Sequence, residues 1–388
     1  MASAKKHNAY RGLIIWMLVL MVLAAAAYAG YLYTNNYLDQ RAKENEENVQ
    51  QTNKARTDEY NAAVSERNQQ AAAADQAMNN KDWPTPAASG WDVLDLTSLP
   101  ITAGSQVSVT RADMLQGGML VVNRWHPMPA DLTDDMMVSI NRTSRADNDK
   151  TTNIPTENAA VNLLPTAVQA LMAMYQEARA EGLDMDNIIV EEGYRNMETQ
   201  TGYWQEVANK FSSRYSGDKL IEKVWTEGVA YPGASDFQAG MSIKLYNHKS
   251  GDKDFSNTPL HETEQGKWLY NNAWKFGYVF RFPVQGFPYP DTVDKAYVTG
   301  ISSKLKVYRY VGIANAIAMH ATGMCLEEYA EYLVEHPHIA VYEDGALRCE
   351  IYRLNDPYSD TSVAIPNGAQ NYTVSSDNLG GMVVAVGF

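Results

Sequence analysis

The segment NIIVEEGYRNMETQ, residues 187–200, decides the fold of this chain. It opens with an apolar run that is typical of a buried strand, and a pattern with helical spacing begins at Met197. The segment therefore predicts a strand that leads into a helix. Such a unit must bury its apolar face against other elements, so we expect packing partners on both sides of it in the sequence.

Apolar periodicity predicts these partners. Helical spacing of three and four residues recurs at 162–182, 197–214, 219–228, 263–275, 312–321 and 326–336. Strand-like runs lie among them, at 241–246, 278–282 and 305–311. Because helices and strands do not alternate as βαβ units, the pattern predicts a mixed α+β domain, which we place at residues 81–338.

The pattern changes from residue 339 onward, where short strand-like runs are separated by turns such as Glu343-Asp344-Gly345. Residues 339–388 therefore predict a small all-β cap. About 50 residues bury too little apolar area to be stable alone, so we expect the cap to pack on the preceding domain.

A transmembrane anchor is predicted at residues 13–33. The run LIIWMLVLMVLAAAAYAGYL, residues 13–32, contains no charged residue, and about 20 helical residues span a hydrocarbon core of about 30 Å. Three basic residues precede it, and they are Lys5, Lys6 and Arg11. The positive-inside rule then places residues 1–12 in the cytoplasm and the rest outside, as a single-pass protein of the cell membrane. The alternative is a signal peptide cleaved after Ala27-Tyr28-Ala29.

Residues 34–80 predict a polar helical stalk. They are rich in Asn, Gln, Ala and Glu, contain no Gly or Pro, and offer few large apolar residues. As a helix, the segment would extend about 70 Å. A weak coiled coil is the alternative, although no apolar heptad is sustained.

Composition excludes several classes of protein. The 388 residues include 32 Lys and Arg against 46 Asp and Glu, a net charge of -14, which argues against a nucleic-acid partner. Two cysteines, Cys325 and Cys349, exclude a four-cysteine zinc site and leave one disulfide bond open. No Gly-rich phosphate loop is visible.

Motifs on both sides of Gly193 resemble the VanY-type zinc D-alanyl-D-alanine carboxypeptidases. Residues 193–200 match the motif G-Y-R-x-x-x-x-Q, and residues 235–244 match the spacing of S-x-H-x-x-G-x-A-x-D through Ser235 and Gly240. Further segments match in the order of the family, at 268–273, 276–283, 299–312 and 326–329. The resemblance covers roughly residues 115–335 and implies the α+β fold of the Hedgehog/DD-peptidase type.

The resemblance also implies a zinc site, but the positions that form it are substituted. In the family, two His and one Asp hold zinc and a Glu is the general base, and these four positions are Phe237, Val307, Lys244 and Lys304 here. Phenylalanine and valine offer no lone pair, and a charged lysine repels the cation and cannot take a proton from water. We therefore expect no catalytic residue, no metal ligand and no cofactor at these positions.

A metal site rebuilt from other ligands is the competing interpretation. Six histidines follow the apolar segment, and they are His126, His248, His261, His320, His336 and His338. They lack the paired spacing of a zinc motif. An active D,D-carboxypeptidase or endopeptidase would need ligands that this pattern does not reveal.

The resemblance implies that a peptide groove persists. Arg195, Gln200 and Ser235 match positions that hold the substrate peptide in the family. Lys244 and Lys304 are placed where zinc would be, so that together with Arg195 they would form a cluster of three cations. Such a cluster suits a carboxylate, because Arg binds one in bidentate fashion. We expect the C-terminal D-Ala of a peptidoglycan stem peptide.

Three hypotheses of function follow. The first is a non-catalytic relative that binds the stem peptide, or a cell-wall protein, outside the membrane. The second is the active peptidase with a non-standard metal site. The third is a surface scaffold whose cleft drifted after it lost the metal, with the lysines paired to Asp236 or neighbouring acids.

Overall fold

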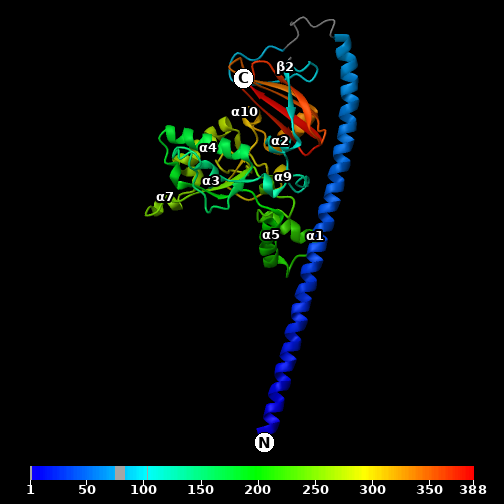
Figure 1. Ribbon diagram of the computed structural model, residues 1–388, viewed down its shortest axis with the longest axis vertical. Helices are drawn as coiled ribbons and strands as arrows, with labels where there is room; N and C mark the ends of the chain where they lie inside the picture. Colours follow the sequence, from blue (N-terminus) through cyan, green and yellow to red (C-terminus); the bar gives the residue numbers. More distant parts are fainter. Residues whose placement is uncertain (1, 75–83, 103) are drawn as a thin grey trace. The chain divides into compact units, whose positions relative to one another are not determined.

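The computed structural model describes residues 2–74, 84–102 and 104–388, and the chain divides into two compact units, Met1–Glu47 and Asn48–Phe388 (Figure 1). The first element is α1 (Ala2–Ala74), a single helix of 73 residues. The predicted anchor at 13–33 lies within α1, as does the predicted stalk as far as Ala74. Residues 75–80 of that stalk lie outside the described residues.

By length and composition, α1 contains one stretch that could cross a membrane, Trp16–Thr52. The large apolar side chains between Trp16 and Tyr33 are exposed, from 43% for Val19 to 74% for Tyr33. Contiguous exposed apolar surface of this kind marks contact with a membrane or a partner. A signal sequence near the N-terminus would meet the same criteria, so the helix is consistent with an anchor and with a signal sequence.

A four-stranded antiparallel sheet forms the centre of the mixed domain. Its strand order is β5 (Ile188–Glu192), β6 (Ser242–Asn247), β8 (Val307–Tyr310) and β7 (Tyr278–Phe280). Side chains alternate between the two faces, and Ile243 and Leu245 of β6 belong to the hydrophobic core. Ser242 and Lys244 therefore lie on the opposite face, which carries the candidate site.

Helix α4 (Pro165–Ala180) packs on the core face of this sheet and is the helix predicted at 162–182. Pro165 occupies its first turn, where the missing N–H costs nothing. Two buried tyrosines connect helix and sheet, because Tyr175 donates from its hydroxyl to the Ile188 carbonyl (3.1 Å) and Tyr278 donates to the Ala167 carbonyl (2.7 Å). The mixed α+β prediction is confirmed.

The other predicted helices are also observed, as α5 (Met197–Phe211), α6 (Gly217–Thr226), α8 (Glu264–Asn272), α10 (Ile313–Thr322) and α11 (Leu326–Glu335). Short elements connect them: α2 (Arg111–Gln116), η1 (Asp134–Met136), β3 (Val138–Ser139), α3 (Ile140–Ser144), β4 (Asn162–Leu163), η2 (Met185–Asn187), η3 (Asp236–Ala239), α7 (Lys253–Asn257), η4 (Leu260–Glu262), η5 (Ala273–Phe276) and α9 (Ala296–Thr299).

The C-terminal strands form the second sheet, in the order β1 (Trp91–Asp95), β9 (His338–Glu343), β10 (Ala346–Asn355), β13 (Gly381–Gly387) and β12 (Asn371–Ser376). A separate pair joins β11 (Thr361–Pro366) to β2 (Gly104–Val109). In Figure 1, β2 lies among the orange and red C-terminal strands, although it comes from the N-terminal side of the domain.

The predicted boundary of the cap, residues 339–388, therefore needs correction. The cap sheets also contain β1 and β2, and β9 begins at His338. A local pattern does not reveal this, because each of the two short strands pairs with a partner more than 200 residues away. The cap packs on α10 and α11 through a shared core that includes Ala316, Tyr329 and Val383.

The two cysteines do not form a disulfide bond. Cys325 and Cys349 are both free and buried. Burial, together with the nearby Glu327 carboxylate, raises the pKa of Cys325 to about 12, and burial also raises the pKa of Cys349. Both thiols therefore stay protonated and behave as small apolar core residues.

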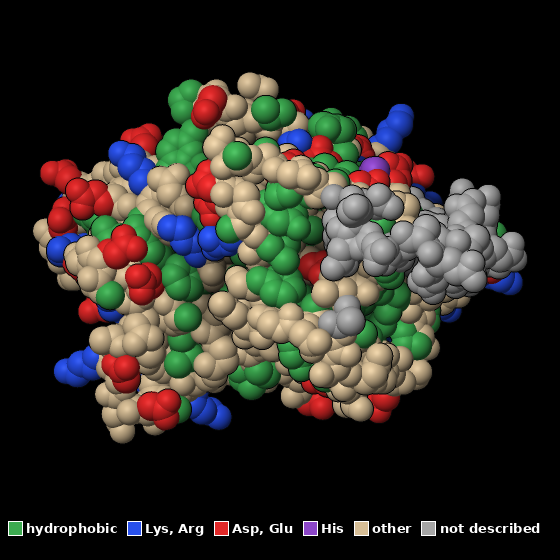
Figure 2. All heavy atoms as spheres, turned by 90° about the horizontal axis from the view of Figure 1, so that it is seen from above, with side chains coloured by type: hydrophobic (Ala, Val, Ile, Leu, Met, Phe, Trp, Pro, Cys, Tyr) green, Lys and Arg blue, Asp and Glu red, His purple; other side chains and the backbone are tan. Residues whose placement is uncertain are grey.

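The surface carries both signs of charge. On the face seen in Figure 2, Lys and Arg side chains are interspersed with Asp and Glu, and apolar side chains lie between them. The net charge of -14 is the basis for expecting no nucleic-acid partner, and that expectation stays a prediction.

Candidate functional site

The outer face of the central sheet carries two of the four substituted family positions. Lys244 of β6 and Val307 of β8 are directly opposed in the register of the two strands. Opposed residues of an antiparallel pair project on the same face, about 5 Å apart at Cβ. Phe237 lies in η3, which ends at Gly240 (φ 69°), and β6 follows. Gly240 has a left-handed backbone conformation, in which a residue with a Cβ is strained, so this position favours glycine.

A buried ion-pair cluster supports this face. Asp236 Oδ1 lies 2.7 Å from Arg309 Nη1 and 3.0 Å from Arg281 Nε, and Ser242 donates to Asp236 Oδ2. Arg281 also makes a bidentate pair with Glu327, with N–O distances of 2.8 and 2.7 Å. Two arginines thus face two carboxylates, and each side chain is exposed by less than a tenth.

This cluster holds Asp236 ionised. Burial acts to raise the pKa of Asp236, but the positive charges of Arg281 and Arg309 outweigh it and hold the pKa below its ordinary value. Removing one partner of such a cluster leaves an uncompensated buried charge, which is costly. Asp236 therefore stabilises the sheet face and is not available to accept a proton or to bind a metal.

Arg195 and Gln200, two of the expected peptide-binding residues, contact each other. Arg195 Nη1 donates to Gln200 Oε1 (3.1 Å), Nη2 pairs with Glu192, and Gln200 Nε2 donates to the Ala230 carbonyl (2.7 Å). The guanidinium lies between two rings, with its Cζ 4.2 Å from the centroid of Phe237 and 4.5 Å from that of Tyr203. Arg195 Nε is buried and has no hydrogen-bond partner within the described part of the chain.

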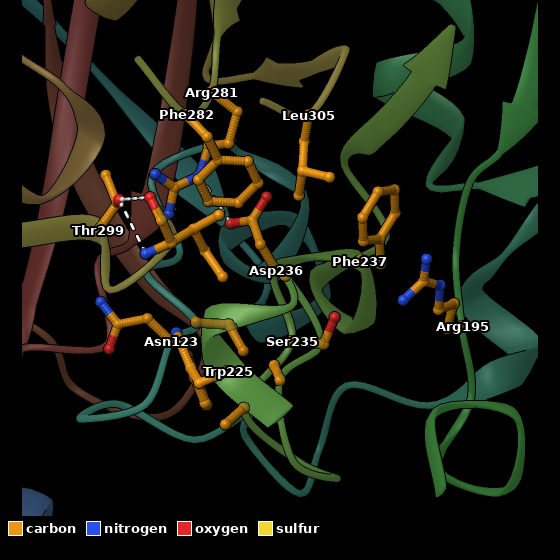
Figure 3. Close-up of a pocket in the computed structure, with 15 residues that line it drawn as sticks. Asn123, Arg195, Trp225, Ser235, Asp236, Phe237, Arg281, Phe282, Thr299 and Leu305 are labelled. Carbon is orange, nitrogen blue, oxygen red and sulfur yellow. Dashed lines mark hydrogen bonds and ion pairs between the residues drawn. The ribbon is translucent and has the colours of Figure 1, made fainter. Parts of the chain in front are cut away.

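Ser235 lines a small cavity beside these residues. The cavity is also lined by Arg195, Phe237, Asp236 and Arg281, and in Figure 3 the ring of Phe237 lies between Arg195 and Asp236. Its volume is about 20 Å³, which is enough for roughly one water molecule. Ser235 itself is 4% exposed. Phe237 is also buried, and its ring forms part of the cavity wall.

The two lysines lie apart from this cavity. Lys244 Nζ pairs with Glu191 Oε1 at 2.9 Å, and both side chains are about a third exposed. Lys304 is exposed at the surface. The predicted cluster of three cations is therefore not formed at the cavity itself, because Arg195 and Lys244 each face a glutamate and Lys304 points to solvent. Asp236 pairs with arginines and not with the lysines.

Sequence reasoning missed three residues of this region, namely Glu191, Glu192 and Lys306. Burial lowers the pKa of Lys306, as does the charge of Lys244, whereas Glu191 opposes the shift. Glu191 thus lies between two lysines. The sequence contained two signals for a charged region here, namely Lys304-Leu305-Lys306 and the pair Glu191-Glu192 before Gly193. Neither signal reveals which glutamate pairs with which lysine.

These residues do not fit a zinc ion. Phe237 and Val307 provide no donor atom, and Lys244 is charged and paired. Across residues 84–102 and 104–388, and in α1 where it is described, no group of three or more His, Cys, Asp and Glu side chains could hold a metal. Several histidines have other partners, since His338 pairs with Glu350 (2.8 Å) and His320 stacks on Trp274.

Comparison with known proteins finds a family that this chain resembles. The model of the VanY family, D-alanyl-D-alanine carboxypeptidase, matches residues 160–293. The resemblance found in the motifs is therefore confirmed, and the VanY match contains Phe237 and Lys244 but ends before Lys304 and Val307.

Two of the similar curated proteins are D-alanyl-D-alanine carboxypeptidases. A D-alanyl-D-alanine carboxypeptidase of Enterococcus faecium is 24% identical over 280 residues, which are 72% of this chain and 78% of that protein. One from Enterococcus faecalis (strain ATCC 700802 / V583) is 27% identical over 221 residues, 56% of this chain and 68% of that protein. The solved structure of the D,D-dipeptidase VanXYg matches with a TM-score of 0.51 and 21% identity, over 73% of this chain and 99% of its own, which shows a shared fold.

Proposed function

We propose that this protein is a non-catalytic member of the VanY family that binds the carboxyl end of a peptidoglycan stem peptide on the outer side of the cell membrane. One observation carries the proposal. The residue types at the zinc and base positions are Phe237, Lys244, Val307 and Lys304, while Arg195 and Gln200 of the motif G-Y-R-x-x-x-x-Q are present and hydrogen-bonded to each other.

The charge of the region supports an anionic ligand. Three cations, Arg195, Lys244 and Lys306, lie near two carboxylates, Glu191 and Glu192, so positive charge is in excess. Arg195 Nε is buried and without a partner in the described structure, and it can donate to a carboxylate oxygen that replaces the Phe237 ring. The related VanXYg binds a D-Ala-D-Ala phosphinate analogue, which has an anionic end of the same kind.

Hydrolysis would need groups that are not supplied here. A general base must accept a proton near neutral pH, and a lysine that already carries its proton cannot accept one. A metal-bound water needs about three donor ligands, and Phe237 and Val307 offer none. The domain therefore retains binding and loses cleavage.

The location of the protein is part of the proposal. The stretch Trp16–Thr52 has the length and composition to cross a membrane, and Lys5, Lys6 and Arg11 precede its apolar part. The positive-inside rule then places the VanY-type domain outside the cytoplasm, where peptidoglycan is exposed.

The first test combines zinc analysis with an activity assay on one sample of the full-length protein. We expect no bound zinc and no release of D-Ala from a pentapeptide stem. Near-stoichiometric zinc together with D-Ala release would establish an active peptidase and refute the proposal.

The second test measures affinity for the same pentapeptide by calorimetry. We expect Lys244→Ala plus Lys306→Ala to weaken binding at least tenfold, because two of the three cations near Glu191 and Glu192 are removed. The matched control is Lys219→Ala plus Lys267→Ala, two exposed lysines on α6 and α8, which should bind like the unmodified protein. Equal affinity of both variants, or no binding by the unmodified protein, would refute the proposal. The remaining hypothesis would then be a surface scaffold with no ligand in the cleft.

A further inference from the structure

A separate pocket lies where the cap meets the mixed domain, and among the described residues it shares none with the lining of the cavity at Ser235. Strands β2 and β12 of the cap contribute to its lining, as do α4 and β8 of the mixed domain through Thr166 and Tyr310. Helix α2 contacts both β12 and α4 and completes the lining (Figure 1). The volume of the pocket is about 370 Å³, within the range of ligand sites, which often lie between domains.

Hydroxyl groups are the commonest polar groups of this pocket. Five of its ten lining residues in the described structure carry one, and they are Ser108, Thr166, Tyr310, Tyr372 and Thr373. A hydroxyl can both donate and accept hydrogen bonds. The buried side chains of Val109 and Val374 add apolar area to the lining. The pocket therefore suits a ligand that carries several hydroxyls on an apolar frame.

Two of these hydroxyls belong to buried groups that make no hydrogen bond within the described residues. Tyr310 is 7% exposed, and burial alone raises the pKa of its hydroxyl to about 12. Thr373 Oγ1 is buried and has no partner in the described part of the chain. A buried polar group without a partner costs free energy, so a ligand that bonds to it gains affinity. By contrast, Thr166 Oγ1 is already engaged, because it donates to the Gln116 carbonyl (2.9 Å).

Charge does not select the ligand of this pocket. Of the described residues that line it, Asp113 is charged and none is lysine or arginine. Asp113 Oδ2 already accepts from the backbone N–H of Thr110 (3.0 Å) and from its hydroxyl (2.6 Å). Without a cation the pocket is poorly suited to a phosphate or a carboxylate, and one engaged carboxylate gives little attraction for a basic segment. A neutral ligand fits the lining best.

An aromatic ring lies at the exposed side of the pocket. Tyr372 is 45% exposed and precedes Thr373 on β12, the edge strand of its sheet. A tyrosine ring combines an apolar face with a polar hydroxyl. One face of a pyranose ring is likewise apolar, since its C–H groups project there, and its hydroxyls lie around the edge. The lining thus offers a surface for the face of a sugar ring and hydrogen-bonding groups for its edge.

We propose that this pocket binds a neutral saccharide. A pyranose ring packs its C–H face on Tyr372, and its hydroxyls bond to those of Tyr310 and Thr373 and to the carboxylate of Asp113. Such a sugar could come from the N-acetylated glycan strand of peptidoglycan or from a polysaccharide without acetamido groups. The chemistry of recognition is the same for both sources, and the test below separates them.

The saccharide site does not depend on the proposed stem-peptide binding. It uses none of Arg195, Lys244 or Lys306, and a saccharide carries no peptide carboxylate. Lys244→Ala plus Lys306→Ala should therefore bind a saccharide as the unmodified protein does. Failure of one proposal leaves the other intact.

The test is isothermal titration calorimetry with the full-length protein in nanodiscs of phosphatidylcholine, because a detergent with a sugar head group would compete. The probes are chitotriose, a trimer of N-acetylglucosamine, and cellotriose, the corresponding glucose trimer without acetamido groups. We expect saturable binding of at least one of them. Binding of chitotriose alone would assign the site to N-acetylated glycans, and binding of cellotriose would assign it to glycans without that group. Absence of saturable binding of both would overturn the proposal.

Two variants locate the binding in the pocket. Tyr372→Ala should weaken it by about fivefold or more, because the ring that packs on the sugar is removed. Tyr310→Phe should weaken it by about fivefold, and this variant should fold, because the hydroxyl makes no hydrogen bond within the described protein that could be lost.

The matched control is Tyr215→Ala, which removes a tyrosine that is 39% exposed and lies outside the pocket lining. This control should bind the saccharide as the unmodified protein does. An equal loss in Tyr215→Ala and Tyr372→Ala, or unchanged affinity in both pocket variants, would mean that the sugar binds elsewhere and would overturn the proposal.

Discussion

Two regions on the same sheet face differ in burial and in charge balance. The cluster of Asp236, Arg281 and Arg309 is buried and balanced in charge. The region around Lys244 and Glu191 is about a third exposed and carries residue types that the VanY motifs do not have there. The supporting cluster depends on burial and constrains the fold, whereas the solvated region can change its residue types at little cost in stability.

Restoring the family residues is the largest expected effect. We predict that the fourfold variant Phe237→His, Lys244→Asp, Val307→His and Lys304→Glu takes up zinc at near-stoichiometric level, because Lys244 and Val307 already face each other across two strands. Metal analysis after dialysis measures the uptake. The control carries the same changes except Val307→Ala and should bind far less. A zinc-free fourfold variant would show that the backbone of the site, and not just its side chains, has moved.

Loss of the buried carboxylate is the next effect in size. Asp236→Asn should lower the free energy of unfolding by about 3–5 kcal/mol, because Arg281 and Arg309 stay buried without it. Denaturant unfolding of the full-length protein in mild detergent measures this, with the exposed Asp291→Asn as control.

The difference in unfolding free energy between the unmodified protein and Asp236→Asn should depend on pH, and the sign of this dependence follows from the pKa of Asp236. The pKa of Asp236 is lower in the folded state than its ordinary value of 3.8, so its contribution is complete above that value and is lost as the pH falls below it. The stability difference between the unmodified protein and Asp236→Asn should therefore shrink below about pH 4. A difference that stays constant to pH 2 would mean that the cluster is held by packing and not by charge.

We expect the smallest effect on stability from the exposed ion pair of Lys244 and Glu191. Glu191→Gln should change the free energy of unfolding by less than about 1 kcal/mol, because Lys244 and Glu191 are solvated and each can bind water instead. The same unfolding assay applies. A loss comparable with that of Asp236→Asn would contradict the contrast between the two regions.

Much of the fold could be predicted from local pattern. The helices α4, α5, α10 and α11 and the strands β5, β6 and β8 have apolar periodicity that burial on one face imposes. The assignment of β1 and β2 to the cap sheets could not be predicted, because strand pairing across more than 200 residues leaves no local mark. For the same reason the free state of Cys325 and Cys349 stayed open until their positions were known.

For the candidate site, too, the residue types could be read from the sequence, whereas their contacts could not. By itself the sequence determined the residue types: the motif order identified the family, and Phe237, Val307, Lys244 and Lys304 at its zinc and base positions argued against a metal. Tertiary structure decided the partners, since it set Glu191 against Lys244, Asp236 against two arginines, and Phe237 over Arg195. Whether a side chain can bind a metal or accept a proton follows from its residue type, so it can be recognised in the sequence. Which charged groups form ion pairs depends on the distances between them, and only the folded structure sets those distances.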